Sequence, residues 1–217
     1  VSNGDDEIKV DNWHHVAVTF GEEGMKLYID GKLHDTNSNT KGLSGNDLPI
    51  VLGQRYDDHS HFNGGLDDLR IYNRSLSQEE VSDLYSLEPA SNNPNSSSQN
   101  SENSSNSTGP TPVDQWNQQF NFNGDEEEVI NHKSEYELEN GTVFLRFKMN
   151  DESRNWIFAK DEDGCSGDCG HLSIGYRSGY INNYGFGVRL QNQGPGSDSI
   201  ILKPDSSTSI EKDKWYS

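Results

Sequence analysis

The sequence predicts an all-β protein in which antiparallel strands form two sheets packed as a sandwich. Short segments of alternating apolar and polar residues recur along the chain, and Gly, Asn, Asp and Ser separate them. Apolar patterns with the helical period are almost absent. Only 29% of the 217 residues are hydrophobic, which suits strands with one apolar and one polar face.

The first 88 residues form a front block of strands that ends in one short helix. Strand-like segments lie at residues 13–20, 25–33, 48–54 and 64–76. Asp30-Gly31 is a typical hairpin dipeptide and predicts a tight turn within the second segment. Ser77 and Glu80 have the spacing of a capping box, which predicts a helix near residues 78–85.

Residues 89–113 are expected to form a flexible linker. Between Ala90 and Pro112, 14 of 23 residues are Ser or Asn, so this segment cannot bury enough apolar surface to fold. The back block, residues 114–217, supplies further strand-like segments at residues 120–124, 141–150, 155–160, 171–177, 184–192 and 199–204.

The charge balance excludes some classes of partner. Lys plus Arg is 17 and Asp plus Glu is 36, which gives a formal charge of −19. Nucleic acid and anionic membrane surfaces are bound by clustered Lys and Arg, so neither is expected as a partner. No apolar run approaches the length of a membrane span. The carboxylates suit calcium, which takes oxygen ligands.

Histidines occur at two places that could suggest a site. His14 and His15 are adjacent on a strand, so their side chains point to opposite faces and cannot chelate one ion. We expect one to be packed or at an edge and the other to pair across the strand. The loop before residue 64 is a better candidate, because binding residues tend to lie in loops. It predicts a metal or glycan contact, with a solvated loop as the alternative, through Tyr56, Asp57, Asp58, His59 and His61.

Cys165 and Cys169 are the only cysteines, which excludes a four-thiolate zinc site. They lie in a loop between two strand-like segments and predict a small disulfide, as expected outside the cytosol. Free thiols are the alternative. The same loop contains four carboxylates and so offers a second calcium interpretation, although it lacks the length and final Glu of an EF-hand. These carboxylates are Asp161, Glu162, Asp163 and Asp168.

Three motifs occur in order between residues 8 and 86: "NWHHVAVTF", "MKLYIDGKL" and "FNGGLDDLRIYNRSLSQEEVSDLY". Together they resemble the laminin G-like branch of the concanavalin A-like jelly rolls. The back block, with "FNFNG", "GTVFLRFK" and "NWIFAK", resembles the N-terminal half of such a module but departs from it at the cysteine loop. The resemblance implies an antiparallel two-sheet jelly-roll sandwich in a secreted or surface protein that binds glycans or proteins.

The domain organisation follows from this resemblance. Residues 1–88 correspond to the C-terminal half of one laminin G-like module and residues 114–217 to the N-terminal half of a second. The terminal "DKWYS" repeats the start of the "DNWHH" strand, as expected for a tandem array cut out of phase. A half sandwich leaves strand edges unpaired. We therefore expect either one composite, circularly permuted sandwich built from both blocks, or separate modules that need missing halves.

Asp67 is the carboxylate of most interest. Strand alternation places it on one face with Leu69 and Ile71, where a charge is costly unless it is paired or bound to a metal. The resemblance implies that Asp67 is a ligand of a structural calcium ion, with Asn123 or a nearby carbonyl as its partner. The alternative is that Asp67 accepts hydrogen bonds from backbone N–H groups at the end of the sheet.

We expect no enzymatic activity, because no carboxylate pair has a glycosidase arrangement and the adjacent Asp67 and Asp68 face opposite ways. The favoured function is a non-catalytic recognition or adhesion module that binds a glycan or an extracellular protein. One alternative is an accessory carbohydrate-binding part of a polysaccharide-degrading enzyme. Another is a structural spacer in a repetitive adhesin, in contact mainly with neighbouring modules.

Overall fold

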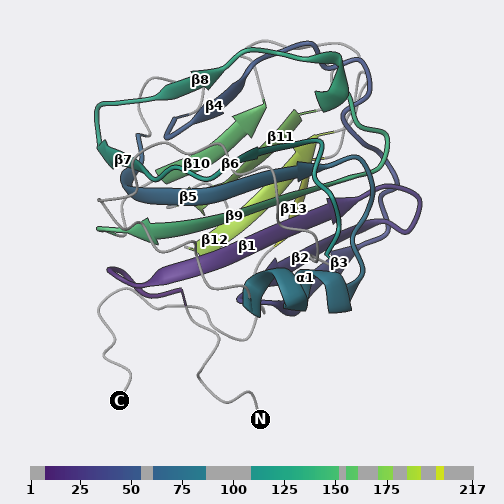
Figure 1. Cartoon of the computed structure of the whole chain (residues 1–217), viewed down its shortest axis with the longest axis horizontal. Coiled ribbons are helices and arrows are strands. Elements are labelled where there is room, and N and C mark those ends of the chain that lie inside the picture. The colour runs from purple at the N-terminus through teal and green to yellow at the C-terminus, as the bar shows by residue number, and fades with distance from the viewer. Residues whose placement is uncertain are drawn as a thin grey trace, which may run out of the picture.

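The computed structural model describes residues 8–54, 61–86, 109–151, 155–160, 171–177, 185–191 and 199–202. Their strands form two antiparallel sheets that face each other (Figure 1). The prediction of an all-β, two-sheet jelly-roll sandwich is therefore confirmed.

The first sheet has the strand order β3-β2-β1-β9-β5-β6, and β7 also pairs with β5. The front block supplies β1 (Trp13–Phe20), β2 (Met25–Ile29), β3 (Lys32–Asn37) and β5 (Asn63–Tyr72). The back block supplies β6 (Asp114–Trp116), β7 (Phe120–Asn123) and β9 (Gly141–Met149). A back-block strand, β9, thus lies between two front-block strands.

The second sheet has the order β13-β12-β11-β10-β4-β8. Only β4 (Ile50–Leu52) comes from the front block. The others are β8 (Glu128–Ile130), β10 (Asn155–Lys160), β11 (His171–Arg177), β12 (Gly185–Gln191) and β13 (Ser199–Leu202). Both blocks contribute to both sheets, so the described strands form one composite sandwich. Assignment of the blocks to halves of two modules stays a prediction, and the "DKWYS" segment lies outside the described residues.

The main core lies between the sheets and follows from the alternation of the strands. Val143, Leu145 and Phe147 of β9 point inward and are buried. The Phe147 ring stacks on Phe186 of the second sheet, with centroids 5.0 Å apart and planes 6° apart. Offset stacking of this kind adds to the free energy gained by burial alone.

The only described α-helix, α1 (Gln78–Ser86), matches the predicted helix. Its capping box forms as expected: Ser77 Oγ accepts from the Glu80 backbone N–H at 3.2 Å, and Glu80 Oε2 accepts from the Ser77 N–H at 2.9 Å. Val81 and Leu84 are buried in a small cluster on the outer face of the first sheet, beneath α1. Figure 1 shows the helix beside β1, β2 and β3.

Local turn chemistry also behaves as predicted. Asp30 and Gly31 join β2 to β3 with φ angles of 47° and 74°, the left-handed region that a two-residue hairpin turn requires. The structure adds β6, β8 and the 3-10 helix Ser134–Tyr136, which the sequence did not predict. These elements have only three residues each, too few to show a periodic pattern.

Candidate functional site

His14 and His15 face opposite sides of β1. His14 Nδ1 lies 2.8 Å from Asp30 Oδ2, and its Nε2 accepts from the Lys9 backbone N–H at 3.0 Å. His14 therefore carries its proton on Nδ1 and donates it to Asp30. His15 lies on the outer face, where its ring makes an edge contact with Tyr85 at 4.9 Å. The two histidines point away from each other, so they cannot bind one metal ion together.

Burial and the nearby Arg146 lower the pKa of His15 to about 4. The imidazole is neutral at pH 7, and its Nε2 is buried without a hydrogen-bond partner among the described residues. His15 is thus an aromatic packing residue beneath α1 and not a proton-transfer group.

The predicted calcium pair does not come together. Asn63 is opposite Asn123 in the β5–β7 ladder, and Asp67 lies four residues further along β5. At the usual rise per residue, Asp67 and Asn123 are about 13 Å apart, too far to share one ion. Asn123 Oδ1 instead accepts from the Asp125 backbone N–H. Among the described residues, no group of three or more His, Cys, Asp or Glu side chains could hold a metal ion.

The expectation that Asp67 shares the core face with Leu69 and Ile71 is also wrong. On β9, Arg146 is opposite Asp67 and Phe144 is opposite Arg70, so β5 contains one extra residue in this interval. The bulge is accommodated by Asp68, whose φ is 52°. It reverses the alternation, so that Asp67 lies on the outer face while Leu69 and Ile71 point inward. Asp67 Oδ1 accepts from the Asp68 backbone N–H at 2.8 Å, which lies within β5, so the expected contact with N–H groups at the end of the sheet stays a prediction.

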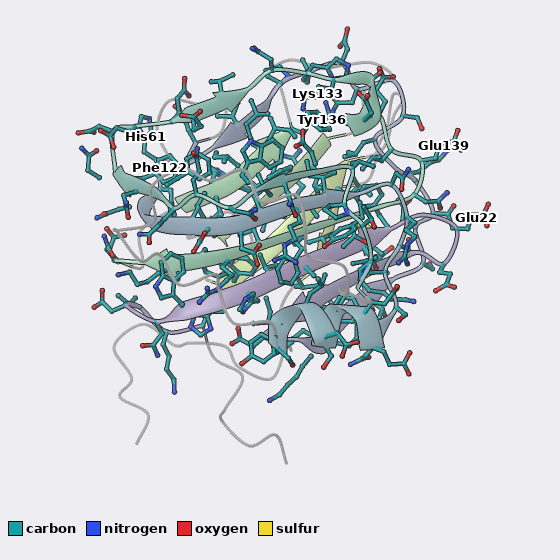
Figure 2. The ribbon with its side chains drawn as sticks, viewed as in Figure 1. Glu22, His61, Phe122, Lys133, Tyr136 and Glu139 are labelled. Carbon is teal, nitrogen blue, oxygen red and sulfur yellow. The ribbon has the colours of Figure 1, made fainter. Side chains whose placement is uncertain are left out.

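The predicted loop site and the predicted disulfide fall largely outside the described residues. The predicted site residues outside the described part of the chain are Tyr56, Asp57, Asp58 and His59, the cysteines Cys165 and Cys169, and the carboxylates of their loop. His61 is described, and both of its ring nitrogens are buried without a hydrogen-bond partner in the part of the chain that the structure describes. Figure 2 shows His61 near Phe122 at one end of the sandwich.

A shallow polar pocket of about 250 Å³ lies at the opposite end, where Figure 2 places Glu22 and Glu139. Its walls come from both blocks, and Asn140 Oδ1 accepts from the Glu22 backbone N–H across the boundary at 2.9 Å. The lining combines two carboxylates with one cation, Lys41. Nothing in this combination selects a particular ligand.

A cluster of one aromatic and two cationic side chains lies on the outer face of the first sheet; we call it the Trp13 cluster. The ladder places Trp13 of β1, Lys148 of β9 and Gly65 of β5 in one row across the sheet. A Cβ atom on Gly65 would lie 2.8 Å from Trp13 Cη2. The indole therefore extends across β9 and lies over the glycine, which leaves space for it.

Both cations of the Trp13 cluster contact the indole. The Arg146 guanidinium carbon is 5.4 Å from the ring centroid and Lys148 Nζ is 5.9 Å from it, within the range of cation–π attraction. Arg146 Nε is buried and has no hydrogen-bond partner among the described residues. Since buried polar groups are usually paired, this nitrogen is a donor that the described part of the fold leaves unused.

Two carboxylates lie beside the cluster, because Asp67 is opposite Arg146 in the β5–β9 ladder and Asp68 interacts electrostatically with Arg146. Asp68 accepts from Arg70 Nε at 2.6 Å; burial raises the pKa of Asp68, and Arg70 partly opposes that rise. Arg70, in turn, lies 5.8 Å from the Phe144 ring. Arg146, Lys148 and Arg70 thus lie near Asp67 and Asp68 on this face of a chain whose formal charge is −19.

Sequence reasoning missed the Trp13 cluster because Trp13 and its two cations are on different blocks. Strand alternation alone places Arg146 and Lys148 on one face of their strand and Trp13 on one face of its own. The pairing of β1 with β9 brings those faces together, and no local pattern predicts that pairing.

The family comparison agrees with the fold. A laminin G family model, described as the concanavalin A-like lectin/glucanases superfamily, matches residues 1–82. The comparisons with curated proteins and with solved structures gave no match. Domains of this family are in general carbohydrate- or protein-binding modules and are typical of extracellular proteins. Within the described residues, no helix is long and apolar enough to cross a membrane. Residues 1–82 of the chain are therefore similar to the laminin G-like branch of the concanavalin A-like superfamily.

Proposed function

We propose that the chain is a non-catalytic recognition module of a secreted or cell-surface protein, and that it binds a glycan or an extracellular protein through the Trp13 cluster. The observation that carries this proposal is the pair of cations at one indole, with the donor Arg146 Nε left without a partner. Arg146 and Lys148 are half-buried as whole residues, and their cationic groups can form charge-assisted hydrogen bonds with a ligand.

The composition of the cluster indicates the chemistry of its ligand. An indole offers apolar area together with a polar edge, and Trp and Arg are frequent anchors of recognition sites. The cations favour a ligand that presents carboxylate, sulfate or several hydroxyl oxygens. The strongly acidic remainder of the chain would repel an anionic ligand elsewhere, which favours this face for such a ligand.

The absence of catalysis is part of the proposal. The two carboxylates nearest the cluster are engaged, Asp68 with Arg70 and Asp67 with a backbone N–H. Laminin G-like domains are generally non-catalytic. An accessory role in a polysaccharide-degrading enzyme also fits this cluster, since such a part binds its substrate without cleaving it. Calcium assistance through Asp67 with Asn123 is not proposed, because the two residues lie too far apart.

The test is an array of glycans and extracellular proteins probed with the purified chain, with and without a chelator. Lys148→Glu should weaken binding to the strongest array ligand at least tenfold, which corresponds to about 1.4 kcal/mol. Lys41→Glu makes the same charge change at the opposite pocket and should leave the affinity within twofold. If the two variants weakened binding equally, the assignment of the ligand site to the Trp13 cluster would be contradicted. Lack of binding to every array member would favour the structural-spacer alternative.

A further inference from the structure

Among the described strands, six pair only with strands of the other block. In the front block, β4 pairs with β8 and β10, and β5 pairs with β6, β7 and β9. In the back block, β6, β7, β8 and β9 have only front-block neighbours. Within its own block, each of these strands would have both edges unpaired, an arrangement that favours association with another chain.

Side chains strengthen the same boundary. Buried Lys160 of the back block donates from Nζ to the backbone oxygens of Asn46 and Leu48 at 2.9 and 2.6 Å. Asn46 Nδ2 donates back to the Lys160 backbone oxygen at 3.1 Å. At the end of β5, Asn63 Nδ2 donates to Asp151 Oδ2 at 2.8 Å. Each block therefore presents the other with a specific set of acceptors and donors.

Nothing in these contacts requires that the two blocks come from one molecule. The blocks are joined by residues 87–108, a Ser- and Asn-rich stretch whose 22 residues can span up to about 75 Å. We propose that the front block of one copy can complete the back block of a second copy, which gives a strand-exchanged dimer with two composite sandwiches. The partner is a second copy of this chain, and the contacts are those of the monomer.

The balance between the two forms depends on concentration. Closed monomer and exchanged dimer have the same interfaces, so the effective concentration set by the linker decides between them. Two segments joined by a short linker that can span their sites have an effective concentration on the order of millimolar. We expect monomer when the chain folds at micromolar concentration and dimer when it folds near millimolar concentration. Once formed, the dimer persists on dilution, because exchange requires the sandwich to unfold.

The test uses two full-length variants that are each expected to be unable to fold. Val16→Asp places a charge in the core of the front block, and Phe147→Asp does so in the back block; both positions are fully buried. Refolded together, the intact front block of one variant can join the intact back block of the other. The mixture should recover a cooperative thermal transition, in a species of twice the 24.3 kDa chain mass. The control mixes Val16→Asp with Ile71→Asp, which both change the front block. This mixture contains no intact front block and should not recover the thermal transition.

The wild-type chain provides a second measurement that does not depend on unfolded variants. It is refolded at about 1 mM, diluted to micromolar concentration and sized by light scattering. A persistent dimer fraction supports the proposal. The proposal would be overturned if only monomer were found after refolding at about 1 mM. Equal recovery in the test and control mixtures would also overturn it.

Discussion

At Gly64 the two blocks approach so closely that no side chain fits between them. Gly64 lies on β5, opposite Met149 of β9. A Cβ atom added there would lie 2.0 Å from the backbone oxygen of Lys148 and 2.7 Å from Cζ of Phe62. The first of these contacts crosses the block boundary and involves backbone, which cannot turn away as a flexible side chain can. Gly64→Ala should therefore force β5 and β9 apart.

The expected cost is that of an overpacked core, about 1–3 kcal/mol of the free energy of unfolding. For a chain of this size, each kcal/mol lowers the melting temperature by about 2–4 °C, so the total fall is about 2–12 °C. Urea unfolding followed by circular dichroism measures the free energy directly. Ser82→Ala, on the exposed face of α1, is the control and should change it by no more than about 0.5 kcal/mol.

The outcome discriminates between the composite sandwich and separate blocks. If the front block folded without β9, no carbonyl would oppose Gly64, and only the contact with the Phe62 side chain would remain. A side chain can turn away, so alanine would cost little stability. A Gly64→Ala variant as stable as the wild type would therefore refute the pairing of β5 with β9.

Three further predictions follow from the outer face and the helix. The pKa of His15 is about 4 in the folded chain and about 6.5 in an unfolded one, so the unfolded state binds more protons between these values. Stability should fall by up to about 3 kcal/mol as the pH drops through this window, and urea unfolding of His15→Phe should show a weaker pH dependence. Ser77→Ala removes an N-cap and should cost about 1 kcal/mol, measured in the same way; no change would argue against the capping box. Asp67→Asn should leave any effect of calcium on the melting temperature unchanged, because Asn123 is too distant to complete a site; loss of a calcium effect would contradict this.

Features set by neighbouring residues could be predicted from the sequence. The alternation of Val16, Val18 and Phe20 is sufficient to define a buried strand face. Asp30-Gly31 supplies the backbone angles of its turn, and Ser77 with Glu80 caps its helix. Each of these signals depends on residues a few positions apart, so each can be recognised without knowledge of the fold.

Features that depend on distant residues could not be predicted in this way. The bulge at Asp68 changes the face of Asp67, and nothing in the local pattern marks the extra residue. The Trp13 cluster exists because β1 and β9 pair across the linker. Strand alternation places Trp13 and Lys148 each on one face of its own strand, but it does not predict their contact.

The central claim is that the two blocks form one sandwich, with β9 between β1 and β5. Nuclear Overhauser contacts between backbone protons of paired strands test this most directly. The account predicts contacts between Val16 and Leu145 and between Leu66 and Phe147, the partners in the two ladders. Cross-strand contacts confined to strands of the same block, such as β1 with β2 or β11 with β12, would contradict it.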